Sequence, residues 1–218
     1  MKVILFGATG MVGQGVLREC LLADDVESVL AIGRSATGQR HAKLREIVQP
    51  DLTSYTAIEP ELAGHDACFF CLGVSAAGMS EADYTRVTYD VTLAAAQVLA
   101  RLSPAMTFIY VSGEGTDSTE QRRAMWARVK GRTENAVRSL PFRAVMFRPG
   151  LIRPLHGIRS KTRVYRIAYT LIWPLFPLLG ALGVLTTTEK VGRAMLRVAR
   201  SGAPSPILGN REINQLAA

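Results

Sequence analysis

The chain alternates between short apolar runs and longer amphipathic stretches. Residues 3–6 form an apolar run, glycines follow, and apolar positions then recur at helical spacing up to Cys20. This order predicts a strand, a tight turn and a helix. Further strands are predicted where apolar runs recur, at residues 28–32, 44–48, 66–71, 105–111 and 143–147. Long helical stretches are predicted at about 81–101 and 122–140.

This alternation predicts the fold class. The predicted strands are apolar on both faces, as in sheets that helices cover on each side. Strands that alternate with helices along the chain pack as a parallel sheet in α/β proteins. We therefore expect a doubly wound Rossmann fold with a parallel sheet flanked by helices. A length of 218 residues suits one domain.

The last third of the chain differs in character from the rest. A basic loop is followed by an uncharged run over residues 167–185 and then by a helix, where Thr186 and Glu189 have capping-box spacing. The formal net charge of +8 arises here, because residues 1–150 hold 16 Lys and Arg against 16 Asp and Glu, whereas residues 151–218 hold 10 against 2. We expect residues 151–218 to form a basic and apolar extension that completes the same domain, on its substrate side.

The glycines after the first strand carry the clearest chemical signal. Gly7, Gly10 and Gly13 lie between a predicted strand and a predicted helix, in the sequence GATGMVG. Glycine leaves space there for a pyrophosphate, and the N–H groups at the helix start favour its negative charge. The spacing is GxxGxxG rather than the GxGxxG of many dehydrogenases. This context predicts an NAD(P)-binding core in residues 1–150, the alternative being a turn that serves packing alone.

The end of the second predicted strand indicates which dinucleotide binds. NAD-binding folds place an Asp or Glu there to hold the ribose 2′-OH, whereas an Arg suits a 2′-phosphate. Here the strand ends at Gly33, Arg34 and Ser35, and Arg40 follows. We therefore expect NADP in preference to NAD, with Arg40 as a second phosphate contact. The alternative is that Arg34 is an ordinary solvated loop residue.

Motifs along nearly the whole chain resemble those of atypical short-chain dehydrogenase/reductases. The chain resembles the small branch that includes the Tat-interacting-protein-like oxidoreductases and bacterial relatives named as NAD-dependent epimerase/dehydratases, and the resemblance rests on LFGATGMVG, CLG, VSG, RVKGRTE and FRPG. The resemblance implies contacts to the pyrophosphate, the adenine, the ribose and the nicotinamide amide. In that order the implied residues are Thr9, Gly10, Met11 and Val12; Asp51 and Leu52; Cys71, Leu72 and Gly73; and Pro149 to Ile152.

The resemblance also implies a reaction, and the sequence departs from its pattern. Members of the wider family reduce a carbonyl by hydride transfer while a tyrosine supplies the proton, a lysine holds the nicotinamide ribose and a serine orients the carbonyl. Ser112 and Lys130 match the serine and the lysine, but Trp126 occupies the tyrosine position. An indole N–H does not titrate near neutral pH, so Trp126 cannot supply and recover a proton. Trp126 shares a helix face with Lys130, where it either covers the nicotinamide or is an ordinary buried aromatic.

Four other residues are chemically able to act as the missing acid, although a structural role is the alternative for each. Tyr110 is the least implausible, because it lies two residues from Ser112 on a predicted strand and hence on the same face. The four are Tyr84, Tyr89, Tyr110 and His156. We expect carbonyl reductase activity to be reduced or absent.

Metal and nucleic acid are not expected as ligands. Cys68 and Cys71 are spaced like metal ligands, but residues i and i+3 of a strand face opposite sides of the sheet. The basic residues are not interleaved with aromatics on a predicted strand platform. Three cysteines and the lack of a signal-peptide pattern predict a cytoplasmic protein.

Residues 153–185 leave several interpretations open. Basic residues precede an apolar run that prolines and glycines interrupt, which favours peripheral contact with an anionic membrane over a span. Packing over the sheet or a homodimer contact is the alternative. Two functions therefore remain: an NADP-dependent oxidoreductase or epimerase-like enzyme for a small-molecule or lipid-like substrate, and a non-catalytic, membrane-associated NADPH sensor.

Overall fold

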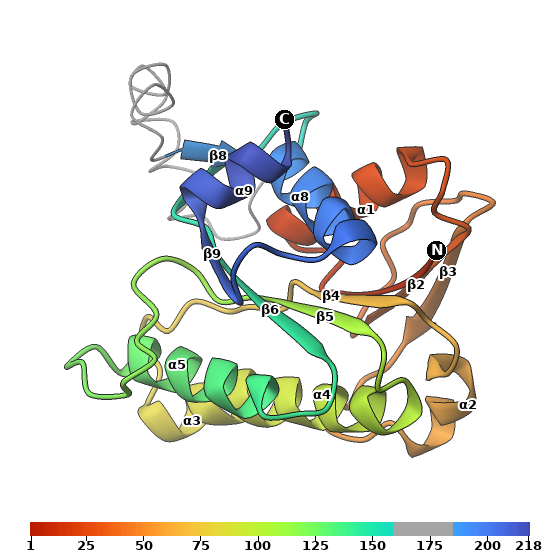
Figure 1. The fold of residues 1–218 in the computed structure, drawn as a ribbon. Helices are drawn as coiled ribbons and strands as arrows, with labels where there is room; N and C mark the ends of the chain where they lie inside the picture. The colour runs from red at the N-terminus through yellow and green to blue at the C-terminus, as the bar shows by residue number, and fades with distance from the viewer. Residues whose placement is uncertain (159–184) are drawn as a thin grey trace.

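A seven-stranded sheet forms the centre of the protein (Figure 1). The computed structural model describes residues 1–158 and 185–218. The sheet order is β3-β2-β1-β4-β5-β6-β9, and each neighbouring pair is parallel. The strands are β1 (Lys2–Phe6), β2 (Ser28–Gly33), β3 (Leu44–Val48), β4 (Ala67–Phe70), β5 (Thr107–Val111), β6 (Arg143–Arg148) and β9 (Ile207–Gly209). The predicted doubly wound Rossmann fold is confirmed.

Helices cover both faces of this sheet (Figure 1). One layer contains α1 (Met11–Leu22), α8 (Thr188–Ser201) and α9 (Asn210–Leu216). The other contains α2 (Glu59–Leu62), which the 3₁₀ turn η1 (Thr56–Ile58) precedes, α3 (Glu81–Thr85), the π-helical turn η2 (Arg86–Asp90), α4 (Val91–Leu102) and α5 (Met125–Arg138). The result is three layers with the sheet in the middle.

Two apolar cores lie on opposite faces of the sheet. Val3 and Leu5 of β1 pack into one core with α1 and α8, whereas Ile4 and Phe6 pack into the other with α4. Successive residues of a strand point to opposite faces, so one short apolar run supplies both cores. This explains why the strands are apolar at nearly every position.

The predicted helical stretch over 81–101 is confirmed, as α3, η2 and α4 in unbroken succession, although apolar periodicity does not distinguish the π turn from an α turn. One detail of the sequence prediction is wrong. The cap of α8 is Thr187, whose Oγ1 accepts a hydrogen bond of 3.1 Å from Lys190 N, and not Thr186. Thr186 still belongs to strand β8 (Leu185–Thr187), which pairs in parallel with β7 (Leu151–Arg153) in a separate two-stranded sheet.

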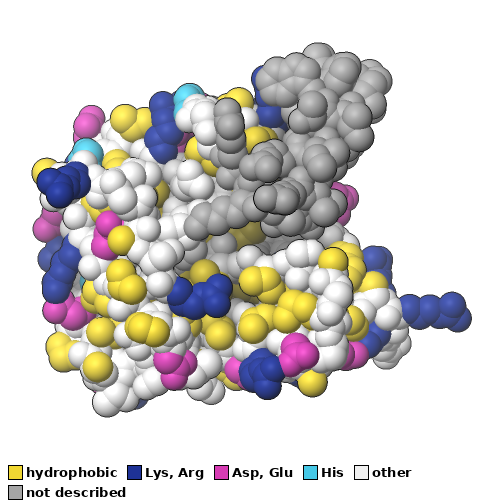
Figure 2. Space-filling model, turned by 180° about the vertical axis from the view of Figure 1, so that it is seen from behind, with side chains coloured by type: hydrophobic (Ala, Val, Ile, Leu, Met, Phe, Trp, Pro, Cys, Tyr) yellow, Lys and Arg dark blue, Asp and Glu magenta, His cyan; other side chains and the backbone are white. Residues whose placement is uncertain are grey.

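The C-terminal third rejoins the Rossmann sheet. Strand β9 lies next to β6 at the sheet edge, and α8 packs against α1. Residues 159–184 lie outside the described part of the chain, and most of the predicted membrane or dimer contact over 153–185 falls there, so that contact stays a prediction. No helix in the described ranges has the length and apolar character needed to cross a bilayer. On the face seen in Figure 2, basic and acidic side chains are interspersed with apolar ones.

Candidate functional site: a nucleotide cavity and a buried polar cluster

A cavity of about 550 Å³ opens where the carboxyl ends of β1 to β4 meet. In open α/β sheets ligands bind at this edge, where the strand order reverses, as it does between β1 and β4 here. The volume falls in the range of small-molecule and cofactor sites. The sequence-predicted cofactor residues that line it are Gly7, Thr9, Gly10, Met11, Arg34, Ser35, Asp51, Leu52, Cys71, Leu72 and Gly73.

The glycine turn forms one wall of this cavity. Gly7 has a φ of +80°, and a Cβ there would lie 2.7 Å from the Cys71 carbonyl carbon, so only glycine suits the position. A Cβ on Gly13 would lie 2.0 Å from Gly7 O, which holds α1 close to the turn. Gly10 is the N-cap of α1 and has no capping side chain. No side chain therefore caps the first N–H groups of α1. These groups lie beside the cavity, where they favour a bound anion.

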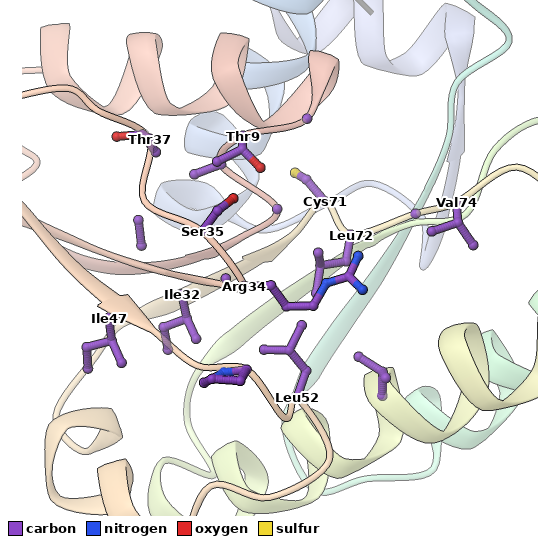
Figure 3. A pocket seen from close by; sticks show the side chains of 18 of the residues that line it. Thr9, Ile32, Arg34, Ser35, Thr37, Ile47, Leu52, Cys71, Leu72 and Val74 are labelled. Carbon is purple, nitrogen blue, oxygen red and sulfur yellow. The ribbon is translucent and has the colours of Figure 1, made fainter. Parts of the chain in front are cut away.

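Arg34 occupies the cavity beyond the end of β2. Its side chain extends between Leu72 and Leu52 (Figure 3), and within the described residues no hydrogen bond or ion pair engages its guanidinium. Ser35 and Thr37 follow Arg34 in the lining. The predicted second contact, Arg40, is not among the described lining residues.

Two carboxylates also line the cavity, and each accepts hydrogen bonds from a loop residue. Glu46 of β3 accepts a hydrogen bond of 2.7 Å from Thr37 N. Asp51 accepts hydrogen bonds from Thr53 Oγ1 and Thr53 N, at 2.6 and 2.8 Å, which lower the pKa of its carboxyl. Sequence reasoning missed Glu46. The available signal was its position in β3, opposite Ala31 near the end of β2.

Sequence reasoning also missed a wall contributed by the helical side of the cavity. Arg86 and Val87 of η2 and Val91 of α4 line it, as does Val74 after β4. Val74 and Val87 are exposed, at 42% and 41% of their surface. A planar base bound here would cover this apolar surface.

A buried polar cluster lies at the ends of β5 and β6, outside the described cavity lining. Ser112 is 4% exposed, and its Oγ donates to Glu134 Oε1 and lies 3.2 Å from Phe147 O. Glu134 is fully buried and also accepts from Arg148, with Nε 3.0 Å from Oε1. Sequence reasoning missed Glu134 and Arg148, although both lie in the quoted motifs RVKGRTE and FRPG.

Lys130 joins this cluster through a backbone group. Its Nζ donates to the carbonyl oxygen of Ser112. Burial lowers the pKa of Lys130 to about 8, and the nearby Glu134 carboxylate partly opposes this effect. The fold therefore brings the predicted serine and lysine together.

Trp126 lies one helical turn before Lys130 on α5 and is partly buried. A Cβ on Gly115 would lie 2.9 Å from its Cη2 atom, so the indole packs on the Gly115 backbone. Pro149 and Ile152, the implied nicotinamide contacts, lie outside the described cavity lining. Pro149 O accepts a 2.9 Å hydrogen bond from Glu114 N.

The four candidate substitute acids have other surroundings. Tyr84 and Tyr110 are each 1% exposed, and burial raises the pKa of Tyr110 above its usual range. The Tyr89 ring has Arg132 4.4 Å from its centroid, and His156 Nε2 lies 2.8 Å from Glu189 Oε2. None of these four is among the described residues that line the cavity.

The cysteines follow the expectation for strand positions. Cys68 packs in the core on the α4 side and Cys71 against the core on the α1 side. Across the described parts of the chain, no group of three or more His, Cys, Asp or Glu side chains is placed to hold a metal ion.

Comparison with known proteins agrees with this geometry. A family described as NAD(P)H-binding matches residues 7–160. "Protein fmp52-2, mitochondrial" of Aspergillus oryzae is 27% identical over 151 residues, 68% of this chain and 66% of that protein. Protein HTATIP2 of Rattus norvegicus is 29% identical over 154 residues, 69% of this chain and 62% of that protein. The alignments thus span slightly less than two thirds of either relative.

Among solved structures, the fold is similar to that of the enzyme WbmF of Bordetella bronchiseptica in complex with NAD⁺. The TM-score is 0.70 at 15% identity, and the match covers 99% of this chain and 76% of that one. The likeness at this identity concerns the fold. The family match over residues 7–160 shows that the chain belongs to the NAD(P)H-binding family, in agreement with the predicted resemblance to atypical short-chain dehydrogenase/reductases.

Proposed function

We propose that this protein binds NADP(H) and is an oxidoreductase- or epimerase-like short-chain dehydrogenase/reductase whose standard proton transfer is impaired. The position of Arg34 is the observation that supports NADP over NAD. It extends into the cavity at the end of β2, and its guanidinium engages no described partner. An arginine at this position suits the 2′-phosphate that distinguishes NADP from NAD.

The remaining cofactor contacts follow the cavity walls. The turn from Gly7 to Gly13 would hold the pyrophosphate, Asp51 and Leu52 the adenine, and Cys71 to Gly73 the ribose. Lys130, Pro149 and Ile152 would lie toward the nicotinamide. When bound, the nicotinamide would supply or accept a hydride.

The positions of Ser112, Trp126 and Lys130 support the proposed impairment of proton transfer. A serine hydroxyl has one hydrogen to donate, and Ser112 donates it to Glu134. Ser112 in this arrangement has no hydrogen left for a substrate carbonyl. Trp126, at the tyrosine position, has no titrating group. Within the described residues, Lys130 therefore contacts the Ser112 backbone and not a hydroxyl that is free to donate a proton.

The same hydrogen bond favours a second candidate function, a non-catalytic NADPH sensor. In that case cofactor occupancy would change the interactions of the C-terminal third, including the proposed peripheral membrane contact over residues 153–185. The substrate in the first case would be a small or lipid-like carbonyl or sugar. We propose a cytoplasmic location, whereas the fungal relative is named as mitochondrial, and cell fractionation would distinguish the two.

Calorimetric titration of nucleotide-free protein with NADPH and NADH tests the cofactor choice. We expect NADPH to bind at least about 10-fold more tightly, and Arg34→Gln to remove most of that difference. Equal affinities in the unsubstituted protein would contradict the NADP assignment. Single-turnover mixing of the NADPH complex with aldehydes and quinones then separates the two functions, because the sensor leaves the nicotinamide reduced.

A further inference from the structure

We propose that Arg86 is a second specificity-determining residue for the adenosine 2′-phosphate, and that Asp83 competes with this phosphate for the Arg86 guanidinium. The inference rests on the proposed NADP(H) binding. It adds a residue from the helical wall of the cavity to the Arg34 site at the end of β2.

Arg86 reaches the cavity because of the local helix geometry. It begins the π-helical turn η2, directly after α3. Arg86, Val87 and Val91 all line the cavity that Arg34 enters. π turns are rare and are often found at functional sites. Here the turn presents Arg86 and Val87 to the cavity, and Val91 follows at the start of α4.

The charge balance of the lining favours a second cation beside Arg34. Among the described lining residues, the charged side chains are Arg34, Arg86, Glu46 and Asp51. With Arg34 alone, the two carboxylates would give this lining a net negative charge, which disfavours a phosphate dianion. Arg86 restores neutrality. Two guanidinium groups also provide enough donors for more than one phosphate oxygen.

The position of Arg86 indicates the adenosine end of the cofactor. The pyrophosphate has its own site at the first N–H groups of α1, on the glycine wall. Arg86 is instead next to Val87, an exposed apolar side chain suited to a base, on the wall that also contains Val91. The phosphate that lies beside the base is the one on the 2′ position.

Asp83 holds the Arg86 side chain in the absence of phosphate. Arg86 Nη2 donates to Asp83 Oδ1, and Asp83 Oδ2 accepts a 2.7 Å hydrogen bond from Ser80, the N-cap of α3. The cap therefore fixes the carboxylate. The two side chains of the ion pair are 70% and 49% exposed, so their attraction is weak and a phosphate dianion competes with it effectively.

Titration of the nucleotide-free protein with 2′,5′-ADP and 5′-AMP tests this, since the two ligands differ by the 2′-phosphate. Arg86→Gln should weaken 2′,5′-ADP about 5- to 30-fold and leave 5′-AMP within about 2-fold. Asp83→Asn should strengthen 2′,5′-ADP by about 2- to 5-fold, because the amide still accepts from Ser80 but no longer attracts Arg86. Arg101→Gln is the matched control, since Arg101 is also an exposed arginine in an ion pair, on α4, and is absent from the described lining.

The outcomes separate this inference from the proposed function. If the unsubstituted protein binds both ligands equally, the NADP assignment fails and the role of Arg86 fails with it. If the protein prefers 2′,5′-ADP, Arg34→Gln removes the preference and Arg86→Gln does not, the inference alone is overturned. An equal loss for both ligands in Arg86→Gln would assign Arg86 to the base or the 5′-phosphate and overturn the 2′-phosphate role. An unchanged affinity of the Asp83→Asn variant for 2′,5′-ADP would overturn the proposed competition between Asp83 and the phosphate. Melting temperatures confirm that each variant is folded, and Arg86→Lys, which keeps the charge, should show an intermediate loss.

Discussion

The hydroxyl of Ser112 donates its hydrogen to the buried carboxylate of Glu134, which is also paired with Arg148. The serine implied to orient a carbonyl is thereby held within the protein interior. The Lys130 ammonium donates to the backbone carbonyl of the same serine. The four side chains Ser112, Glu134, Arg148 and Lys130 thus form one buried cluster, and none of them is among the described residues that line the cavity.

Glu134→Ala should strongly destabilise the protein. The substitution leaves the partly buried Arg148 guanidinium without its carboxylate, and removing one partner of such a pair costs about 3 kcal/mol. Urea denaturation measures the loss. Glu61→Ala removes the exposed partner of Arg45 and should leave the unfolding midpoint nearly unchanged. Equal losses of unfolding free energy for the two substitutions would show that the buried ion pair stabilises the protein no more than the exposed one.

The free energy of unfolding should contain a pH-dependent contribution from Lys130. Its folded-state pKa of about 8 is below the ordinary value of 10.5, so between these values the unfolded chain binds the additional proton. This contribution therefore rises with pH from about 8 to 10.5. The buried thiols of Cys20 and Cys71 have raised pKa values and act in the opposite direction. The measurement is thus the difference in unfolding free energy between wild type and Lys130→Met across this range. The exposed Lys190→Met serves as control, and a flat difference for Lys130 would contradict the lowered pKa.

Gly13→Ala should destabilise the glycine turn. The new Cβ would lie 2.0 Å from Gly7 O, a backbone atom that cannot yield without moving the turn. Overpacking of this kind costs about 1–3 kcal/mol, and we expect cofactor affinity to fall as well. Gly73→Ala is the matched control, because a Cβ there has no neighbour within 4 Å. Thermal melts compare the two variants, and a normal melting temperature for Gly13→Ala would show that the turn adapts.

Trp126→Tyr should introduce proton transfer. A phenol at this position stands one helical turn before Lys130, and general acid catalysis contributes about 10²- to 10⁴-fold. Because Ser112 remains bonded to Glu134, we expect a gain near the lower end, measured as single-turnover NADPH oxidation with a quinone. Trp126→Phe opens similar space without a hydroxyl. A similar gain in NADPH oxidation rate in the Trp126→Phe variant would show that the added space, and not proton transfer from the phenol, causes the gain.

Several features of the fold and site were predictable because they depend on local sequence. The strands that build the core, such as residues 3–6, are continuous apolar runs, and the glycine turn has fixed spacing. Arg34 was predictable because it directly follows an apolar strand. In contrast, β9 and α9 were not predicted, since three residues at the sheet edge carry too short an apolar pattern to identify.

The amino-acid sequence was enough to predict the parallel α/β architecture, the position of the glycine turn, and Trp126 where the family resemblance implies a tyrosine. Those features reside in periodicity, spacing and residue identity over a few neighbouring positions. In contrast, the contact of Ser112 with Glu134, 22 positions away, and the cavity that Arg86 shares with Arg34 are evident only in the folded molecule. Such contacts depend on where separate strands and helices end in space, and the periodicity of a single element does not encode the distance between side chains on two of them.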